Sequence, residues 1–407
     1  MAEPQVEFFA EGAASHVSEK PMAKRTTGAG RRVFVFAGGG TGGHLYPAIA
    51  LAEELRRRAP DAEVVFVGTP RGLEATVVPR LGWPLHMIAV RGVRRRLAAA
   101  NVMVPLRAAA SLAQSLALLR RLRPAAVVGT GGYVSGPVLV AAWLLALPRL
   151  IQEQNVRPGA TTLLLAHIVH EVHVSYKESI GFFRHPEKVR LSGNPIRQRP
   201  PELTPGQARQ HLGLAPEKKT LLVFGGSQGA HRINEAVVRA LPALMSRPDV
   251  QLVWGTGNSD FARVADAAAT WKDRVLVRDY IEDIYTAYRA SDLVLCRAGA
   301  ITLAELQLFG LPALLVPYPF AAAQHQEWNA RTLAQHGAAR LVLDKDFTAE
   351  RCIVELTPLL EDDEGLKRMG ARMAELARPE AAARIVEAIL ALAARADAHA
   401  DDAEPKR

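Results

Sequence analysis

The sequence predicts an α/β protein made of two Rossmann-like domains, each with a parallel sheet. The chain has 407 residues, more than a single domain usually holds. Short β-branched and aromatic runs alternate with longer Ala-, Leu- and Arg-rich stretches, which is typical of parallel sheets covered by helices. A glycine-rich turn between a strand pattern and a helix pattern occurs twice, at residues 39–44 and 226–231. We therefore expect an architectural duplication.

The individual elements follow in chain order. We expect strands at 32–37, 63–68, 125–130, 220–225, 250–255, 292–296 and 312–317, and helices at 48–58, 206–212 and 381–395. Because each glycine turn opens its own strand–helix series, the expected domains are 32–196 and 219–380. A proline-containing linker at 197–218 joins them. Residues 1–31 are expected to be a disordered extension, 381–395 a separate final helix, and 396–407 a frayed tail.

Composition narrows the class of protein. The two cysteines, Cys296 and Cys352, form no metal-ligand spacing, so a zinc site or a disulfide framework is not expected. The formal net charge of +9 permits anionic lipids, phosphorylated substrates or nucleic acid as partners. The first 30 residues lack the pattern of a secretory signal. The longest apolar stretch, 138–147, is too short to span a bilayer, which takes roughly 20 residues.

The first glycine turn is a candidate phosphate-binding loop. Five of the six residues at 38–43 are glycine, and glycine lets backbone N–H groups approach an oxyanion at a helix N-terminus. No acidic residue ends the next strand, which argues against a dinucleotide site. The alternative is a tight turn needed only for packing. His44 follows in the first helical turn, where a histidine serves as a general base or, more commonly, packs or caps the helix.

Further polar groups follow later strand ends, where open α/β sheets bind ligands. They are the 131–137 loop with Tyr133, residues 152–155, the 297–305 segment with Glu305, and residues 324–326. Four adjacent polar side chains at 152–155 are not expected in a core, and a solvated loop is their alternative. The Glu305 carboxylate could accept two ribose hydroxyls or be an ordinary exposed helix residue.

Two further patterns concern the membrane and metals. The residues Arg91, Arg94, Arg95 and Arg96 precede the apolar residues Leu97, Val102, Met103 and Val104, as in an interfacial segment or a solvated basic loop. No GxxxxGK[ST], GxSxG or HExxH occurs, and none of the expected strands is directly followed by an Asp-x-Asp. We therefore expect no metal and no cofactor.

Seven ordered motifs together resemble one family. They are GGGTGGH, GGYVSGP, EQN, GNPIR, FGGSQGAH, RAGAITLAE and HQEWNA, which lie between residues 38 and 330, and the similarity as a whole runs from about residue 32 to about residue 393. The chain resembles the UDP-N-acetylglucosamine:lipid I N-acetylglucosaminyltransferases of peptidoglycan synthesis, the MurG family. The resemblance implies the GT-B fold, with two Rossmann-like domains facing each other across a cleft and a C-terminal helix crossing back to the first.

The resemblance also implies a donor site, mainly in the second domain. The UDP-GlcNAc positions it implies are Thr41, Gly42, Gly43, Asn155, Arg197, Ser227, Ile281, Ala300, Ile301, Thr302, Leu303, Glu305, His325 and Gln326. Ser227 and its loop amides would meet the phosphates, Ile281 the uracil, and Glu305 the ribose. His325 and Gln326 would read the sugar. Tyr133 would lie on the acceptor side.

The family commonly has histidine before Glu-Gln-Asn, where this chain has Gln152. This leaves His44 and Glu153 as candidates for the base, and we favour His44. The implied reaction transfers GlcNAc with inversion to the 4-hydroxyl of lipid I, giving lipid II. Implied partners are lipid I, the anionic leaflet at the cytoplasmic face of the plasma membrane, and other proteins of cell-wall synthesis, but no nucleic acid. A UDP-GlcNAc 2-epimerase and a non-catalytic sugar-nucleotide-binding protein remain alternatives.

Overall fold

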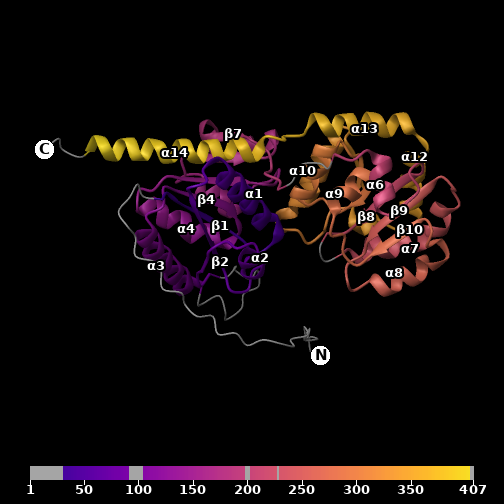
Figure 1. Cartoon of the computed structure of the whole chain (residues 1–407), viewed down its shortest axis with the longest axis horizontal. Coiled ribbons are helices and arrows are strands. Elements are labelled where there is room, and N and C mark those ends of the chain that lie inside the picture. Colours follow the sequence, from indigo (N-terminus) through magenta and orange to yellow (C-terminus); the bar gives the residue numbers. More distant parts are fainter. Residues whose placement is uncertain (1–30, 91–103, 198–201, 227–228, 404–407) are drawn as a thin grey trace, which may run out of the picture. The chain divides into compact units, whose positions relative to one another are not determined.

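The computed structural model describes residues 31–90, 104–197, 202–226 and 229–403 (Figure 1). Residues 32–407 form one compact unit that contains two sheets. All strand pairs in both sheets are parallel. The prediction of an α/β protein with two parallel sheets is confirmed.

The first sheet has seven strands in the order β3-β2-β1-β4-β5-β6-β7. Its strands are β1 (Val33–Gly38), β2 (Glu63–Gly68), β3 (Leu85–Met87), β4 (Ala126–Gly131), β5 (Arg149–Glu153), β6 (Glu171–Val174) and β7 (Val189–Leu191). Its helices are α1 (Gly42–Arg58), α2 (Glu74–Arg80), α3 (Val104–Leu122), α4 (Gly132–Leu144), α5 (Ala160–Leu165), η2 (Lys177–Phe182) and η3 (Pro186–Lys188). Together with the last helix, α14 (Ala381–Ala403), these elements are called the first lobe.

The second sheet has six strands in the order β10-β9-β8-β11-β12-β13. They are β8 (Lys219–Phe224), β9 (Val250–Gly255), β10 (Val275–Arg278), β11 (Leu293–Cys296), β12 (Ala313–Leu315) and β13 (Ala339–Leu341). The accompanying helices are α6 (Pro205–His211), α7 (His231–Met245), α8 (Phe261–Ala268), η4 (Ala269–Trp271), α9 (Ile284–Ala290), α10 (Ala300–Phe309), η5 (Ala322–Gln324), α11 (His325–Gln335), η6 (Asp344–Asp346), α12 (Ala349–Glu361) and α13 (Asp363–Glu375). These elements are called the second lobe.

Strand β1 shows why the first sheet forms. Its sequence, VFVFAG, is apolar on both faces, and all six residues are buried, as expected for a strand covered by helices on both sides. Val35 points into one hydrophobic cluster and Phe34 and Phe36 into another. The second cluster also holds Ile385 and Ile389 of α14, so the last helix packs on the first lobe, beside α1 (Figure 1).

Two sequence-based expectations differ from the structure, one for the C-terminal tail and one for the expected linker at 197–218. The final helix continues to Ala403, whereas residues 396–403 were expected to fray. Alanine has the highest helix propensity, and four of these eight residues are alanine. In the expected linker, α6 is held on the second lobe because Arg209 donates to Ala290 O and pairs with Asp292 at 2.8 Å.

Candidate active site

Both sheets have a point where the strand order reverses, between β1 and β4 and between β8 and β11. Open α/β sheets bind ligands beside the carboxyl ends of the strands at such points. Thr41 and His44 follow β1, and Tyr133 follows β4. Glu305 lies in α10, which follows β11. The structure therefore places Thr41, His44 and Tyr133 at the switch point of the first sheet, and Glu305 in the helix after strand β11 at the switch point of the second.

Packing explains part of the first glycine turn. A side chain at Gly39 would collide with the carboxylate of Glu74, and Gly40 has a φ of 84°. Glu74 is buried, and it accepts from Gly40 N at 2.7 Å and from Thr69 N at 2.8 Å. The packing interpretation therefore holds for Gly39 and Gly40, while the start of α1 carries the less buried residues Thr41, Gly42 and Gly43.

The His44 imidazole lies between the two loops of the first lobe. The His44 Nδ1 is 3.0 Å from Gln154 Oε1, and the backbone carbonyl oxygen of His44 accepts a hydrogen bond from Thr130 Oγ1 at 2.8 Å. Gly131, with a φ of 100°, leaves room for the ring, because a Cβ there would come 2.6 Å from Nδ1. Tyr133 is 57% exposed in the first turn of α4. His44 is thus held by groups from the loops after β4 and β5.

The expectation that residues 152–155 avoid the core is wrong for three of the four. Gln152, Glu153 and Gln154 are 0%, 3% and 2% exposed, while Asn155 is partly exposed. Strand β5 lies between β4 and β6, so its end is covered by neighbours. Buried polar groups are tolerated where they are hydrogen-bonded, and all three side chains form hydrogen bonds within the first lobe.

The Glu153 carboxylate accepts hydrogen bonds from the loop that follows it. Its Oε1 accepts from Asn155 N at 3.1 Å and Nδ2 at 3.2 Å, and its Oε2 accepts from Gly159 N at 3.1 Å. Both carboxylate oxygens are therefore engaged in shaping residues 155–159. This geometry favours His44 over Glu153 as the candidate base.

The start of α10 supplies the corresponding surface of the second lobe. Gly299 is the N-cap, Ile301 and Thr302 are partly exposed, and Leu303 is fully buried. Leu303 therefore offers no exposed surface to a ligand, and its N–H donates to Gly299 O at 2.9 Å. Helix N-termini favour anions because their first N–H groups lack partners within the helix.

Of two further predicted donor positions in this lobe, the structure describes Ile281 but not Ser227. Ile281 packs against the end of β9, where a Cβ on Gly255 would come 3.0 Å from its Cδ1. Ser227 lies outside the described residues.

Glu305 is the predicted ribose ligand, and two tyrosines hold it. Its Oε1 accepts from the Tyr285 hydroxyl at 3.2 Å and its Oε2 from the Tyr288 hydroxyl at 3.0 Å. Burial raises the pKa of Glu305 to about 7, against the opposing effect of these two bonds. The sequence pattern predicts neither tyrosine as a partner of Glu305, because both lie in α9, with Tyr285 20 residues and Tyr288 17 residues before Glu305.

His325 and Gln326 stand at the start of α11. The Gln326 Oε1 accepts from Tyr318 N at 2.9 Å, and His325 Nδ1 donates to Ala322 O at 2.8 Å. Burial lowers the pKa of His325, the bond to Ala322 opposes this, and the charge of His44 lowers the pKa further.

Asparagines missed as individual site residues connect the two lobes. Asn329 accepts from Val156 N at 2.9 Å and donates to Asn155 Oδ1 at 3.1 Å. Asn194 donates to Ala300 O at 3.3 Å. Their presence in the GNPIR and HQEWNA motifs was the available signal, but the sequence does not say that they bond across lobes.

Arg197 stands apart from the other predicted donor residues. Its guanidinium forms a salt bridge with Glu53 of α1 at 2.7 Å. A contact between Arg197 and a donor would require this pair to open.

Both Rossmann-like lobes match domains of one glycosyltransferase family. Residues 34–174 match the glycosyltransferase family 28 N-terminal domain, and residues 220–385 match the glycosyltransferase family 28 C-terminal domain. The chain is therefore a glycosyltransferase of family 28.

Curated relatives define the family more narrowly. A UDP-N-acetylglucosamine--N-acetylmuramyl-(pentapeptide) pyrophosphoryl-undecaprenol N-acetylglucosamine transferase of Chlorobaculum parvum is 47% identical, over 88% of this chain and 98% of the relative. Its namesake in Desulforudis audaxviator is 42% identical, over 89% and 98%. The chain belongs to this family of N-acetylglucosamine transferases.

Solved structures agree with the fold. The crystal structure of Acinetobacter baumannii MurG has a TM-score of 0.72 and 28% identity, covering 88% of this chain and 99% of that one. A UDP-GlcNAc 2-epimerase from Neisseria meningitidis has a TM-score of 0.62 at 15% identity, over 88% and 99%. The second likeness shows the fold alone, so it lends no weight to the epimerase alternative.

Proposed function

We propose that this protein transfers N-acetylglucosamine from UDP-GlcNAc to the 4-hydroxyl of the muramyl group of lipid I, forming lipid II. The observation that carries the proposal is that hydrogen bonds link the two switch points. Asn194 donates both to the backbone oxygen of Gln154, whose side chain contacts His44, and to Ala300 O at the start of α10. Membership in the transferase family named above supports the same reaction.

The second lobe would hold the donor. The amides at the start of α10 suit the diphosphate, because a helix N-terminus stabilises negative charge that grows on a leaving group. The Glu305 carboxylate, held by two tyrosine hydroxyls, retains lone pairs for a ribose diol. His325 and Gln326 lie on the neighbouring α11 start, where they would contact the sugar.

The first lobe would supply the base and the acceptor surface. His44 would take the proton of the attacking hydroxyl while the bond between the anomeric carbon and the diphosphate breaks. This assignment is supported by the half-buried position of the ring and by the engagement of Glu153 with backbone amides. Tyr133, which is exposed in the first turn of α4, would border the acceptor.

The lipid acceptor calls for a membrane surface, which we place on the first lobe, at the cytoplasmic face of the plasma membrane. Trp143 and Leu144, at the end of α4, are 48% and 54% exposed. Beside them lies a surface groove whose lining includes Lys188, Arg190 and Arg395. Exposed apolar residues flanked by cations suit an anionic leaflet.

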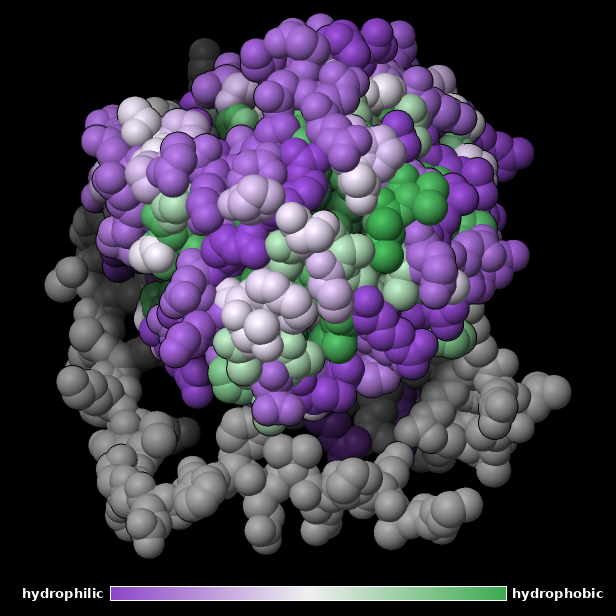
Figure 2. Space-filling view, turned by 90° about the vertical axis from the view of Figure 1, so that its right-hand side faces the viewer, coloured by the Kyte–Doolittle hydropathy of each residue, from purple (hydrophilic) through white to green (hydrophobic). Residues whose placement is uncertain are grey.

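Other described surfaces look different. The face of the second lobe in Figure 2 is mainly hydrophilic, with apolar side chains in small groups. The predicted basic run at 91–96 and its apolar neighbours up to Met103 lie outside the described residues. In the parts of the chain that the structure describes, no helix is both long and apolar enough to cross a membrane.

The test is incubation with labelled UDP-GlcNAc, with and without a polyprenyl-pyrophosphoryl-muramyl acceptor, followed by product analysis. The proposal expects label in the lipid product and release of UDP only when acceptor is present. Conversion of UDP-GlcNAc to its 2-epimer without acceptor, or donor binding without turnover, would replace the proposed function by one of the alternatives.

A further inference from the structure

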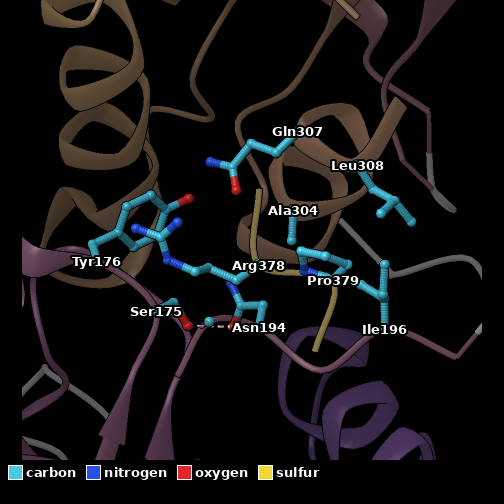
Figure 3. Close-up of a pocket in the computed structure, with 10 residues that line it drawn as sticks. Ser175, Tyr176, Asn194, Ile196, Ala304, Gln307, Leu308, Arg378 and Pro379 are labelled. Atoms are coloured by element: carbon cyan, nitrogen blue, oxygen red, sulfur yellow. Dashed lines mark hydrogen bonds between the residues drawn. The ribbon is translucent and has the colours of Figure 1, made fainter. Parts of the chain in front are cut away.

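A chain of buried side-chain amides runs behind His44. It consists of Gln154, Gln152 and Asn194, which are 2%, 0% and 5% exposed. The Ser175 hydroxyl joins it by donating to Asn194 Oδ1 at 2.7 Å (Figure 3). Each end of a buried amide must face a group of the opposite kind, because an N–H only donates and a carbonyl oxygen only accepts. The surroundings therefore fix how each amide is oriented.

The orientation of Gln154 follows from two backbone carbonyls. Its Nε2 lies 2.7 Å from Thr130 O and 3.3 Å from Gln152 O. If the amide were reversed, its oxygen would face the carbonyl oxygens of Thr130 and Gln152. No hydrogen bond could then form among these three oxygen atoms, because none of them carries a proton. The NH₂ group must therefore face the carbonyls, which leaves Oε1 facing His44 Nδ1 at 3.0 Å.

The remaining amides reinforce this orientation. Asn194 Nδ2 faces Gln154 O at 3.0 Å and Ala300 O at 3.3 Å, so its Oδ1 faces Gln152 Nε2 at 3.1 Å. The Gln152 Oε1 is then the acceptor for Gln154 Nε2. Gln152, which departs from the histidine of the family motif, thus supplies an acceptor that holds Gln154 in place.

An oxygen that only accepts imposes a tautomer on its partner. Neutral imidazole carries one proton, and Gln154 Oε1 requires that proton on His44 Nδ1. The lone pair is then on Nε2, which forms no hydrogen bond with the described residues. We propose that Gln154 is a positioning residue that holds His44 in the Nδ1–H tautomer, so that Nε2 receives the proton of the acceptor hydroxyl.

This inference rests on the proposed function for its catalytic consequence. The acceptor oxygen forms a bond to the anomeric carbon, its proton moves to His44 Nε2, and UDP leaves with the electron pair of the broken bond. In the other tautomer Nε2 would carry a proton and could not accept one. Gln154 therefore acts on kcat through His44 and has no direct contact with the donor.

The test combines a spectroscopic signature with kinetics on the full-length protein. Ring ¹⁵N spectra of protein labelled in histidine report which nitrogen is protonated, and His44→Gln identifies the His44 signals by their loss. We expect a protonated Nδ1 and an unprotonated Nε2 in the parent. Gln154→Met removes the acceptor at similar volume, so the Nε2–H form should appear.

General-base catalysis typically accelerates the chemical step by about 10²–10⁴-fold. Because the Nδ1–H form of His44 stays accessible in Gln154→Met, only part of this acceleration should be lost, and kcat should fall by about 10–100-fold. The donor KM should change by less than about twofold, because uniform donor binding is not affected.

Gln251→Met is the matched control. Gln251 is also fully buried, but it bonds to Ala215 and Thr220 in the second lobe. It should lose stability as Gln154→Met does, while tautomer and kcat stay at parent values. A parent His44 protonated on Nε2, or a Gln154→Met protein with parent tautomer and kcat, would overturn the proposal. Absence of transfer by the parent would instead reject the proposed function, because the tautomer is read without turnover.

Discussion

At the scale of single residues, buried polar groups carry most of the candidate site. Glu305 is an example, because burial raises its pKa to about 7 while two tyrosine hydroxyls still hold it. A carboxylate offers acceptors to a ribose diol on both oxygens, whereas the protonated acid has one oxygen that donates. The protonation state of Glu305 should therefore govern donor affinity in the neutral range.

We expect the donor KM to rise as pH falls through about 7, because the folded-state pKa of Glu305 lies there and the acid form loses an acceptor. The measurement is the donor KM against pH, from about one unit above to one unit below that pKa.

Glu305→Gln serves as the control for this dependence and should flatten the inflection near neutrality. Glu305→Ala should raise the donor KM about tenfold or more, since a hydrogen bond to a charged group is worth about 1.5–3 kcal/mol. An unchanged donor KM in folded Glu305→Ala would remove this residue from the site.

At the scale of elements, α14 belongs to the first lobe although it follows the second in sequence. Ile385, Val386 and Ile389 are fully buried in the cluster that contains Phe34 and Phe36 of β1. Packing of this amphipathic face, rather than the Ala-rich sequence alone, fixes the position of the helix.

Ile389→Ala should lower the free energy of unfolding by about 2–5 kcal/mol, because it removes a buried side chain and leaves a cavity. Denaturant unfolding measures the change. Glu387→Ala, on the exposed side of the same helix, should stay within about 0.5 kcal/mol of the parent. Equal effects of the two substitutions would mean that α14 is not anchored through this face.

The elements also show what the sequence can and cannot predict. Long apolar strands such as β1 and β9 lie within one residue of their expected ranges. The short strands β3, β7 and β13, of three residues each, carry too little pattern to be recognised. The burial of Gln152 and Gln154 was missed because a polar side chain reveals its partners only in three dimensions.

At the scale of the whole molecule, the first lobe would meet the membrane. The predicted basic run at 91–96 should add about 1 kcal/mol per arginine on an anionic surface. Arg94/Arg95/Arg96→Gln should therefore weaken co-sedimentation with anionic vesicles by roughly two orders of magnitude at low salt. Turnover of a short-chain soluble acceptor should barely change. Parent-like pelleting of the variant would assign the run to a solvated loop.

Metal ions should not be essential for transfer, because the Asp-x-Asp that follows β13, Asp344-Lys345-Asp346, has Asp344 in a salt bridge with Arg297. The described residues also hold no group of three side chains that could ligate a metal ion. We expect full activity after treatment with EDTA at saturating donor. A modest stimulation by magnesium would be compatible with this, because cations screen substrate phosphates. Abolished activity that magnesium or manganese restores would show that a metal is required.

The central claim is that the first lobe supplies the base and the second lobe binds the donor. The most direct measurement is the transfer rate of His44→Gln at saturating UDP-GlcNAc, together with the donor Kd of the same protein. We predict that kcat falls by about 10²–10⁴-fold while the Kd stays within about twofold of the parent. A parent-like kcat would contradict the assignment of His44, and a Kd that rises in step with the lost rate would contradict the division of roles between the lobes.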